Sequence, residues 1–404
     1  MSSELRGSLT PGYNALVVGN APTALEVGAL LIVGTMAMMI TGVQSLVLGA
    51  IVEQHRLSLP QLGWATAAEL LAIGLAETTV GALLKPNRLR AIGIAAGLLV
   101  VLADLAGTVC SGLTMVADRL VAGLAEGTLL WLPISMIARS RRPALWWSVF
   151  QIAQAVAQLA FALIVPVAIL DHFGANGALV ALASTGLIAM AAALFIPTHF
   201  EELPTAHSNT NVVGERGGIP LAGYVILGAM FLLAAFTFGV YAYFEPLGAQ
   251  AGHSTQMVGF GMSASLAGQI LGVLSATLVV NRLRAFPVLI ASAAANFALL
   301  ALFASLPGAW VFVATGFLYG LVFLFTLPFM IPMVIEVDPS RRSAVVLNGV
   351  LFVGASVGPA LCAFAVHDSD ARGALMVSGI CLAVSTAILV AVHFRSARVS
   401  PAAG

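Results

Sequence analysis

The chain has 404 residues, of which 60% are hydrophobic and 8% charged, and its formal net charge is zero. An ordinary soluble domain is about 25% charged, so this composition excludes a soluble fold. It predicts an integral membrane protein whose first partner is the lipid bilayer. A zero net charge without a basic tail gives no reason to expect a nucleic-acid partner.

Apolar stretches long enough to cross a bilayer as helices follow one another along the chain. Six are expected at 24–50, 60–84, 91–112, 115–137, 144–169 and 178–197, and six at 220–246, 255–280, 287–306, 309–335, 343–366 and 374–394. The polar segment 198–219 separates them. The sequence therefore predicts an all-α membrane protein of twelve spans, with six-helix halves at 24–197 and 220–394, a linker at 198–219, and terminal segments 1–23 and 395–404.

A short internal repeat supports the division into two halves. The sequence Asn-Arg-Leu-Arg-Ala at 87–91, after the second span, recurs at 281–285, after the eighth. Parallel repeats of this kind occur in transporters whose halves rock about a central site.

The basic residues predict the orientation of the spans. Of 17 lysine and arginine residues, 14 fall on the side that holds both termini, two (Arg56 and Arg372) fall on the other side, and Arg119 lies within a span. Cytoplasmic loops carry the excess of basic residues in membrane proteins. Both termini are therefore expected in the cytoplasm, and we expect the inner (plasma) membrane of a bacterium.

Ionisable residues inside the spans are concentrated in the first half. They are Glu69 and Glu77 in the second span, Asp104 in the third, and Asp118, Arg119 and Glu126 in the fourth. Charge within hydrocarbon is costly and usually functional. Five acids cannot all pair with one arginine, so some acids are expected to hold protons in some state of the protein. The pattern predicts proton coupling through Glu69, Glu77, Asp104, Arg119 and Glu126; for Asp104 a purely structural pair with Arg119 is an equal alternative.

Short motifs in these spans resemble those of the major facilitator superfamily. Arg119, Gly123 and Gly127 match its fourth-span motif, and Gly354, Gly358 and Pro359 form a Gly-x-x-x-Gly-Pro sequence in the eleventh span. The family's loop motif after the second span is matched loosely at 81–90, where Lys85 replaces an acid that the family uses in a cytoplasmic latch. The resemblance implies the twelve-helix fold of a secondary transporter, expected as a monomer, with Arg119 facing the cavity and taking part in proton coupling or substrate contact.

Polar side chains within other spans are candidates for substrate binding. Gln151, Gln154 and Gln158 form one stripe on the fifth span, which could face a wet cavity or make interhelical hydrogen bonds. The other single candidates are Gln44, Tyr241, Gln269, Tyr319 and Asn348.

No cofactor, metal site or enzymatic activity is expected. All seven histidines lie in loops or at span ends, and the chain has neither a nucleotide-binding glycine-rich loop nor a catalytic serine or cysteine constellation. The sequence predicts a transporter that couples a small organic solute to protons by alternating access. Uptake by symport is slightly favoured, because the fifth span lacks the motif of the drug–proton antiporters. The alternatives are a proton-driven efflux antiporter, a sodium-coupled symporter, and a non-transporting receptor or assembly factor.

Overall fold

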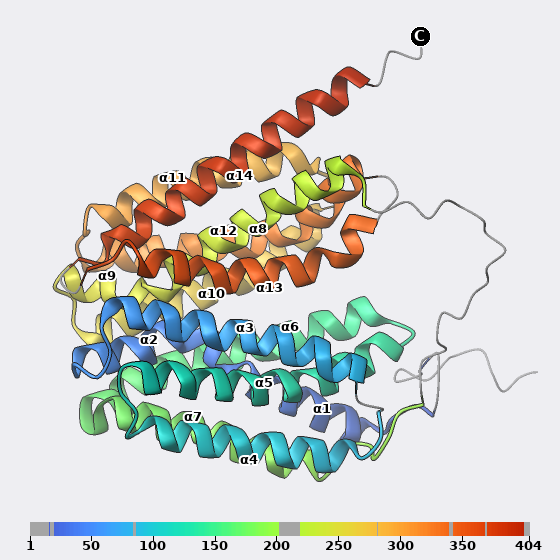
Figure 1. Cartoon of the computed structure of the whole chain (residues 1–404), viewed down its shortest axis with the longest axis vertical. Helices are drawn as coiled ribbons and strands as arrows, with labels where there is room; N and C mark the ends of the chain where they lie inside the picture. The colour runs from blue at the N-terminus through green and yellow to red at the C-terminus, as the bar shows by residue number, and fades with distance from the viewer. Residues whose placement is uncertain are drawn as a thin grey trace, which may run out of the picture.

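The computed structural model describes residues 16, 20–83, 86–201, 219–280, 282–338, 342–367 and 370–399. Within these residues the chain is helical, apart from connecting segments and three isolated β-bridges. The helices lie side by side in two groups, α1–α7 and α8–α14 (Figure 1), which we call the first and the second half.

The first half holds six membrane crossings, one of which is broken. Its elements are α1 (Ala24–Ala37), α2 (Met39–Glu53), α3 (Leu59–Leu83), α4 (Leu89–Gly107), α5 (Leu113–Arg139), α6 (Pro143–Ile164), the π-helical turn η1 (Val165–Leu170) and α7 (Asp171–Ala193). A capping box begins α1: the backbone N–H of Glu26 donates to Thr23 Oγ1 at 3.2 Å, and the Thr23 N–H donates to the Glu26 carboxylate at 2.8 Å.

The second half repeats this arrangement. Its elements are α8 (Leu221–Ala242), α9 (Phe244–Gln250), α10 (Thr255–Val279), α11 (Ala285–Ala304), α12 (Ala309–Val337), α13 (Arg342–Ala363) and α14 (Arg372–Val399). When α1–α2 and α8–α9 are each counted as one crossing, the described residues form the twelve spans that the sequence predicts. The described residues of the internal repeat lie at the starts of equivalent helices: 87–91 run into α4, and 282–285 run into α11.

Two predicted spans and one predicted connection differ in detail from the helices observed. The first span is divided at Met38 and the seventh at Tyr243, where the backbone leaves helical geometry. The break expected at 170–177 is instead helical, because η1 joins α6 to α7 and the chain bends at Gly174, whose φ is +61°. Glycine adopts this left-handed geometry without steric cost. Hydropathy does not register such breaks, since apolar residues lie on both sides of them.

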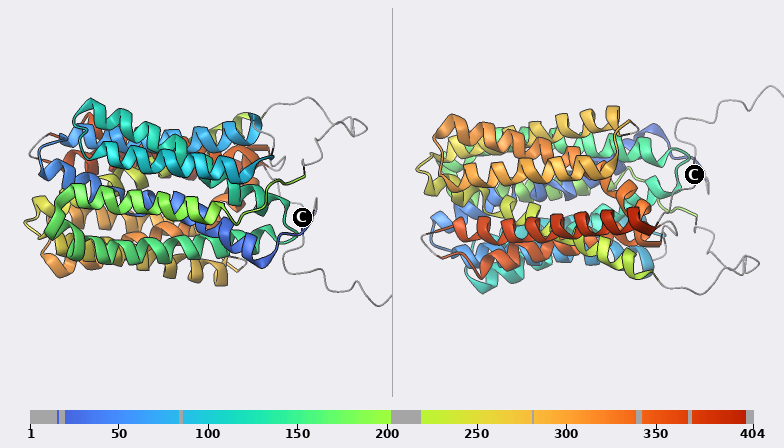
Figure 2. Two further views of the ribbon diagram at one scale, coloured as in Figure 1. Left: turned by 90° about the horizontal axis from the view of Figure 1, so that it is seen from below. Right: turned by 90° about the horizontal axis from the view of Figure 1, so that it is seen from above.

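The two ends of the bundle are distinct. The chain enters α1 and leaves α14 at one end, which we call the terminal end, and α9 lies at the other, the distal end (Figures 1 and 2). At the distal end the halves touch through α2 with α9 and α10, and through α6 and η1 with α10; α3 and α13 also pack together across the halves. Any opening of the distal end must therefore separate these helices.

Candidate functional site

A set of ionisable side chains is buried between α3, α4 and α5. The Arg119 side chain of α5 is 0% exposed. Its guanidinium nitrogens lie 3.3 Å from a carboxylate oxygen of Glu69 on α3, 3.0 Å from one of Asp104 on α4, and 2.8 Å from one of Asp118. One guanidinium is thus shared by three carboxyl groups from three helices.

Two further polar residues complete this group. The amide Nε2 of Gln44 on α2 donates to Glu69 Oε2. Glu126 lies on α5 and is 4% exposed, and its Oε2 has no hydrogen-bond partner among the described residues. We call Gln44, Glu69, Asp104, Asp118, Arg119 and Glu126 the Arg119 cluster.

Glycines on α5 allow the helices around this cluster to approach closely. A Cβ at Gly123 would overlap the backbone oxygen of Glu69, and a Cβ at Gly127 would overlap that of Ile73. On α4, a Cβ at Gly107 would lie 3.1 Å from the Asp118 carboxylate. Small residues commonly let transmembrane backbones pack in this way. The Arg-x-x-x-Gly-x-x-x-Gly spacing therefore places Arg119 and the backbone of α3 in one closely packed layer.

A central cavity of about 280 Å³ lies between the two halves. From the first half, Gln151, Gln154 and Gln158 line it, together with Trp147 and Phe150. The glutamine stripe predicted on the fifth span thus lies at the cavity. Gln158 also donates to the backbone oxygen of Met38 at 2.6 Å, so one end of the stripe is bound to the break between α1 and α2. All three glutamines thus line the cavity, and Gln158 also makes an interhelical hydrogen bond.

The second half contributes a more apolar wall to the central cavity. Phe238 and Phe323 meet edge to face, with ring centroids 6.0 Å apart, and Tyr241 and Gln269 add polar groups. Glu77 is the only carboxyl group among the described residues that line the cavity, and no lysine, arginine or histidine is among them. The cavity is therefore amphipathic, with three glutamine amides from the first half, one from the second, and aromatic rings from both.

The remaining predicted site residues lie elsewhere. Gln44 and Tyr319 do not line the central cavity; Gln44 belongs to the Arg119 cluster, and the Tyr319 hydroxyl donates to the backbone oxygen of Thr237 at 2.6 Å. Asn348 lies on α13, and its side chain is outside the described residues. Arg119 itself is not a lining residue, although the family resemblance implied that it faces the cavity.

Helices α2 and α3 contribute both to the Arg119 cluster and to the lining of the central cavity. Gly42 and Leu70 line the cavity, while Gln44 and Glu69, their near neighbours on α2 and α3, belong to the cluster. A rotation or bend of either helix would therefore change the polarity of the cavity wall. This proximity connects the charged group to the volume in which a solute can bind.

This combination of a broken-helix bundle, a buried fourth-span arginine and a cavity between two halves agrees with the comparison to family models. The model of the Major Facilitator Superfamily matches residues 30–350. The chain belongs to the major facilitator superfamily.

Solved structures show the same fold at low sequence identity. The nucleoside transporter NupG is 16% identical, with a TM-score of 0.65, over 92% of this chain and 99% of that one. A variant of the same transporter gives a TM-score of 0.71 at 15% identity, over 91% and 99% of the two chains. A bacterial homologue of the human lysosomal transporter Spinster, in an inward-facing and occupied conformation, gives 0.63 at 13% identity, over 93% and 98%. A comparison with curated proteins gives no match.

In this major facilitator chain the distal end is closed by hydrogen bonds between the halves. The Tyr241 hydroxyl donates to the backbone oxygen of Gly42 at 2.6 Å, and the Tyr243 hydroxyl donates to that of Leu59 at 3.1 Å. We call this contact, where residues 241–245 face residues 42–59, the distal seam. Sequence reasoning missed it, because backbone acceptors carry no sequence signal.

The loop after α3 contacts its own half at the terminal end. The Leu89 N–H donates to the Thr198 backbone oxygen, and the Phe200 N–H donates to that of Pro86, each at 2.9 Å. Arg139 lies over the Phe200 ring, 5.4 Å from its centroid. Lys85, which replaces the acid of the family's latch motif, is outside the described residues. The described part of this loop thus binds the exit of α7.

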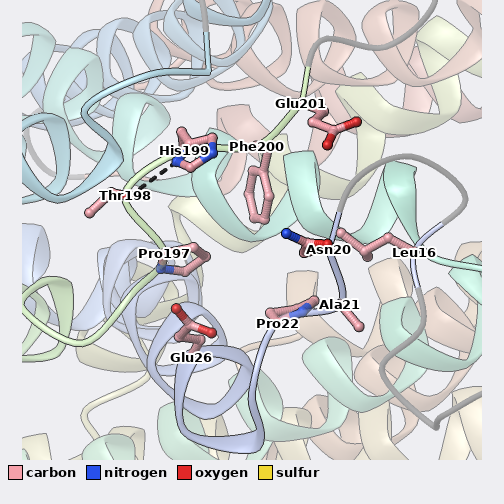
Figure 3. Close-up of a pocket in the computed structure, with 10 residues that line it drawn as sticks. All are labelled: Leu16, Asn20, Ala21, Pro22, Glu26, Pro197, Thr198, His199, Phe200 and Glu201. Atoms are coloured by element: carbon pink, nitrogen blue, oxygen red, sulfur yellow. Dashed lines mark hydrogen bonds between the residues drawn. The ribbon is translucent and has the colours of Figure 1, made fainter.

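A smaller pocket of about 170 Å³ lies beside this connection (Figure 3). Residues 197–201 form one wall, and Leu16, residues 20–22 and Glu26 form the other. The ionisable side chains that line it are His199, Glu26 and Glu201, and His199 pairs with Thr198 at 3.2 Å. Among the described residues no group of histidine, cysteine, aspartate and glutamate has the arrangement of a metal site.

Proposed function

We propose that this protein is a proton-coupled secondary transporter of a small amphipathic organic solute, neutral or cationic, that works by alternating access. The observation on which the proposal rests is the Arg119 cluster beside the central cavity. Proton coupling, the direction of transport and the solute are all part of the proposal.

The charge balance of the Arg119 cluster supports proton coupling. Glu69, Asp104 and Asp118 share a single guanidinium, and the buried Glu126 adds a fourth carboxyl group. Burying an uncompensated carboxylate costs far more than burying a neutral carboxylic acid. Neutrality then requires protons on most of these carboxyl groups. Exchange of Arg119 between acids during the transport cycle would release and rebind those protons.

The position of the central cavity supports alternating access. The cavity lies on the terminal side of the distal seam, and Glu77 and the 38%-exposed Trp147 line it toward the terminal end. We propose that the terminal end is cytoplasmic, as the distribution of arginines predicts. The structure then corresponds to an inward-facing state, the state named for the Spinster homologue of similar fold.

The lining of the central cavity supports the proposed class of solute. Glutamine amides can donate and accept hydrogen bonds, and the aromatic rings offer flat apolar surfaces. No basic side chain is available among the described lining residues to balance an anion. Nucleosides, the solutes named for the transporter NupG, are uncharged ring compounds with polar edges, so they are the first solutes to test.

A proton-driven efflux antiporter is the second candidate. Glu77 is a lone carboxyl group in a partly aromatic cavity, which suits an amphipathic organic cation. Sodium coupling is less favoured, because Arg119 occupies the centre of the acid cluster and its positive charge would repel a bound sodium ion.

The test begins with binding to the purified protein. A panel of nucleosides and amphipathic organic cations is screened by thermal shift and by quenching of tryptophan fluorescence, since Trp147 lines the cavity. The ligand that stabilises the protein is then assayed in proteoliposomes with an imposed proton gradient or an imposed sodium gradient. Accumulation driven by the proton gradient alone is expected.

The orientation of the gradient distinguishes the two candidates. Uptake into vesicles with acid outside indicates symport, whereas uptake with acid inside indicates antiport. A Trp147→Phe variant should lose the fluorescence response but keep the thermal shift, which assigns the ligand to the central cavity. Accumulation with sodium alone, or a ligand that binds without any flux, would overturn the proposal.

A further inference from the structure

A second buried carboxyl group lies outside the Arg119 cluster, in the distal seam. Glu245 belongs to α9, the short helix after the break at Tyr243, and it is 2% exposed. Its backbone N–H donates to Ser45 Oγ on α2 at 2.8 Å. A Cβ at Gly49 would overlap the Glu245 carboxylate, so the absence of a side chain at Gly49 makes room for it. Glu245 thus lies between the two halves.

The Glu245 carboxyl group has no balancing charge. Its Oε1 is buried and has no hydrogen-bond partner among the described residues. The helices that pack against α9, namely α2, α8, α10, α11 and α12, contain no lysine, arginine or histidine, and the charged group that faces Glu245 is another acid, Glu53 of α2. The segment at 370–372, which bonds Gln250 of α9, holds one acid and one base, Asp370 and Arg372, and these pair with each other at 3.1 Å.

The basic groups nearest along the chain are used elsewhere. His253, in the turn after α9, pairs through Nε2 with the backbone oxygen of Pro307 at 2.8 Å. Arg56, in the turn after α2, donates to the backbone oxygens of Gly107 and Cys110, and the neighbouring His55 is exposed at the surface. A carboxylate at Glu245 would therefore be buried without compensation, whereas a neutral carboxylic acid fits the site.

The surroundings of Glu245 depend on the state of the transporter. The seam that encloses it is formed by both halves, with Ser45 and Gly49 from the first half and α9 from the second. Alternating access requires the distal end to open, which separates α2 from α9. The carboxyl group then meets water, where it ionises like any exposed glutamate.

We propose that Glu245 is a second proton-binding site, distinct from the Arg119 cluster, and that a proton bound there holds the distal seam closed. Release of this proton accompanies opening of the distal end. The inference goes beyond the coupling role proposed for the Arg119 cluster, because it assigns a proton to the seam itself.

Thermodynamic linkage sets the size of the effect. If the closed seam holds one more proton than the open seam, the ratio of closed to open molecules falls by up to about tenfold for each unit rise in pH. The closed state is therefore favoured at acidic pH and loses population as the pH rises. A glutamine at this position cannot release a proton, so it should abolish this dependence.

The experiment measures backbone hydrogen exchange of the full chain in lipid nanodiscs, without any solute. Peptides covering 42–49 and 241–250 are compared between the parent and Glu245→Gln at the same pH, which removes the intrinsic pH dependence of exchange. The parent should match Glu245→Gln at acidic pH and exchange progressively faster than it at mildly alkaline pH. Parent and variant profiles that coincide at every pH would overturn the proposal.

Three further variants separate this site from the proposed transport mechanism. Glu245→Asp keeps a titratable group, so it should retain the pH dependence if the fold tolerates the site. The double variant Glu69→Gln/Glu126→Gln should retain it as well, even if accumulation is lost. Glu336→Gln, at a half-exposed acid that faces His393 near the end of α12, serves as the matched control and should behave like the parent. The inference would be overturned if the double variant lost the pH dependence of hydrogen exchange in the distal seam while Glu245→Gln retained it. That result would assign the proton to the Arg119 cluster.

Discussion

At the scale of single residues, Arg119 is the side chain on which the buried charges of the first half depend. It contacts carboxyl groups from three helices and is completely enclosed. Removing one partner of a buried ion pair leaves the other charges uncompensated, which typically costs about 3 to 5 kcal/mol. The stability of the first half should therefore respond strongly to this residue.

Arg119→Leu should lower the unfolding temperature, and more so at neutral than at acidic pH. In the variant the acids of the cluster can be buried only in their protonated form. A fall in pH supplies these protons, so the stability deficit should shrink as the pH decreases. Thermal unfolding in detergent across a pH series measures it.

Arg139→Leu provides the matched control for this measurement. Arg139 is also buried on α5, but it donates to the backbone oxygens of Ser135 and Glu201 at 2.8 and 3.1 Å rather than to acids. Its stability deficit should not depend on pH in the acidic range. Equal pH dependence in the two variants would contradict the proposed role of Arg119.

Glu69→Gln and Glu126→Gln should each abolish gradient-driven accumulation while sparing exchange of the solute across the membrane. Glutamine keeps the shape of the side chain but cannot carry a proton, so the coupling step is lost and the binding step remains. Counterflow and accumulation assays in proteoliposomes distinguish the two activities. The assignment fails if both variants accumulate solute like the parent, and Glu336→Gln, far from the cluster, should be unaffected.

At the scale of helices, the packing of α3 against α5 sets the geometry of the cluster. Gly123 and Gly127 face the backbone of α3 so closely that a methyl group at either position would overlap a carbonyl oxygen. Overpacking of a well-packed core typically costs about 1 to 3 kcal/mol. The glycines of the fourth-span motif therefore keep α5 close to α3, which holds Arg119 against Glu69 of α3.

Gly123→Ala and Gly127→Ala should lower the unfolding temperature and reduce the rate of transport, because α3 must move away from α5. Gly228→Ala, on α8, is the control, since a Cβ there would meet nothing within 4 Å. Thermal unfolding and initial transport rates measure both effects. If the variants at Gly123 and Gly127 are as stable as Gly228→Ala, the contact between α3 and α5 is not close enough to exclude a methyl group, and the proposed role of these glycines is wrong.

Much of this helix packing could be predicted from the sequence, and the missing parts have physical causes. The spacing of Arg119, Gly123 and Gly127 indicated a polar helix in close contact with another, and that contact is present. Asp118 was not among the residues predicted to couple protons, and its pairing with Arg119 was not expected, because consecutive residues on a helix do not face each other. No role was predicted for Glu245 either. Hydropathy does not reveal the helix break at Tyr243, which places Glu245 in the distal seam.

At the scale of the whole molecule, composition, span lengths and the repeat at 87–91 and 281–285 predicted the twelve-helix fold, which is confirmed. Composition and span length follow from the need of each helix to cross the hydrocarbon layer, so they predict the number of spans. The central cavity could be predicted only in part, because its lining depends on how the halves pack. The glutamine stripe lines the central cavity. Gln44 and Tyr319 are also polar, but Gln44 bonds Glu69 and Tyr319 bonds the backbone of Thr237.

The orientation of the molecule can be tested by labelling from either side of the membrane. In a Cys110→Ser background, a Gln151→Cys variant should react with a membrane-impermeant thiol reagent in inside-out vesicles and be protected in right-side-out vesicles. The reason is that the central cavity lies on the terminal side of the seam, and the terminal end is predicted to be cytoplasmic. Val109→Cys, at an 83%-exposed position in the distal turn between α4 and α5, should show the opposite pattern. Labelling of Gln151→Cys from outside would contradict this orientation.

The closed distal seam also determines how the transporter could be blocked. In the conformation described, Tyr241, Tyr243 and Glu245 join the halves at the end that is predicted to face outward, and the central cavity extends from there toward the other end, where Glu77 and Trp147 line it. A drug-like blocker that binds in the central cavity from that end would first have to enter the cell. An antibody or other large extracellular binder could act only by recognising the sealed surface and keeping it shut.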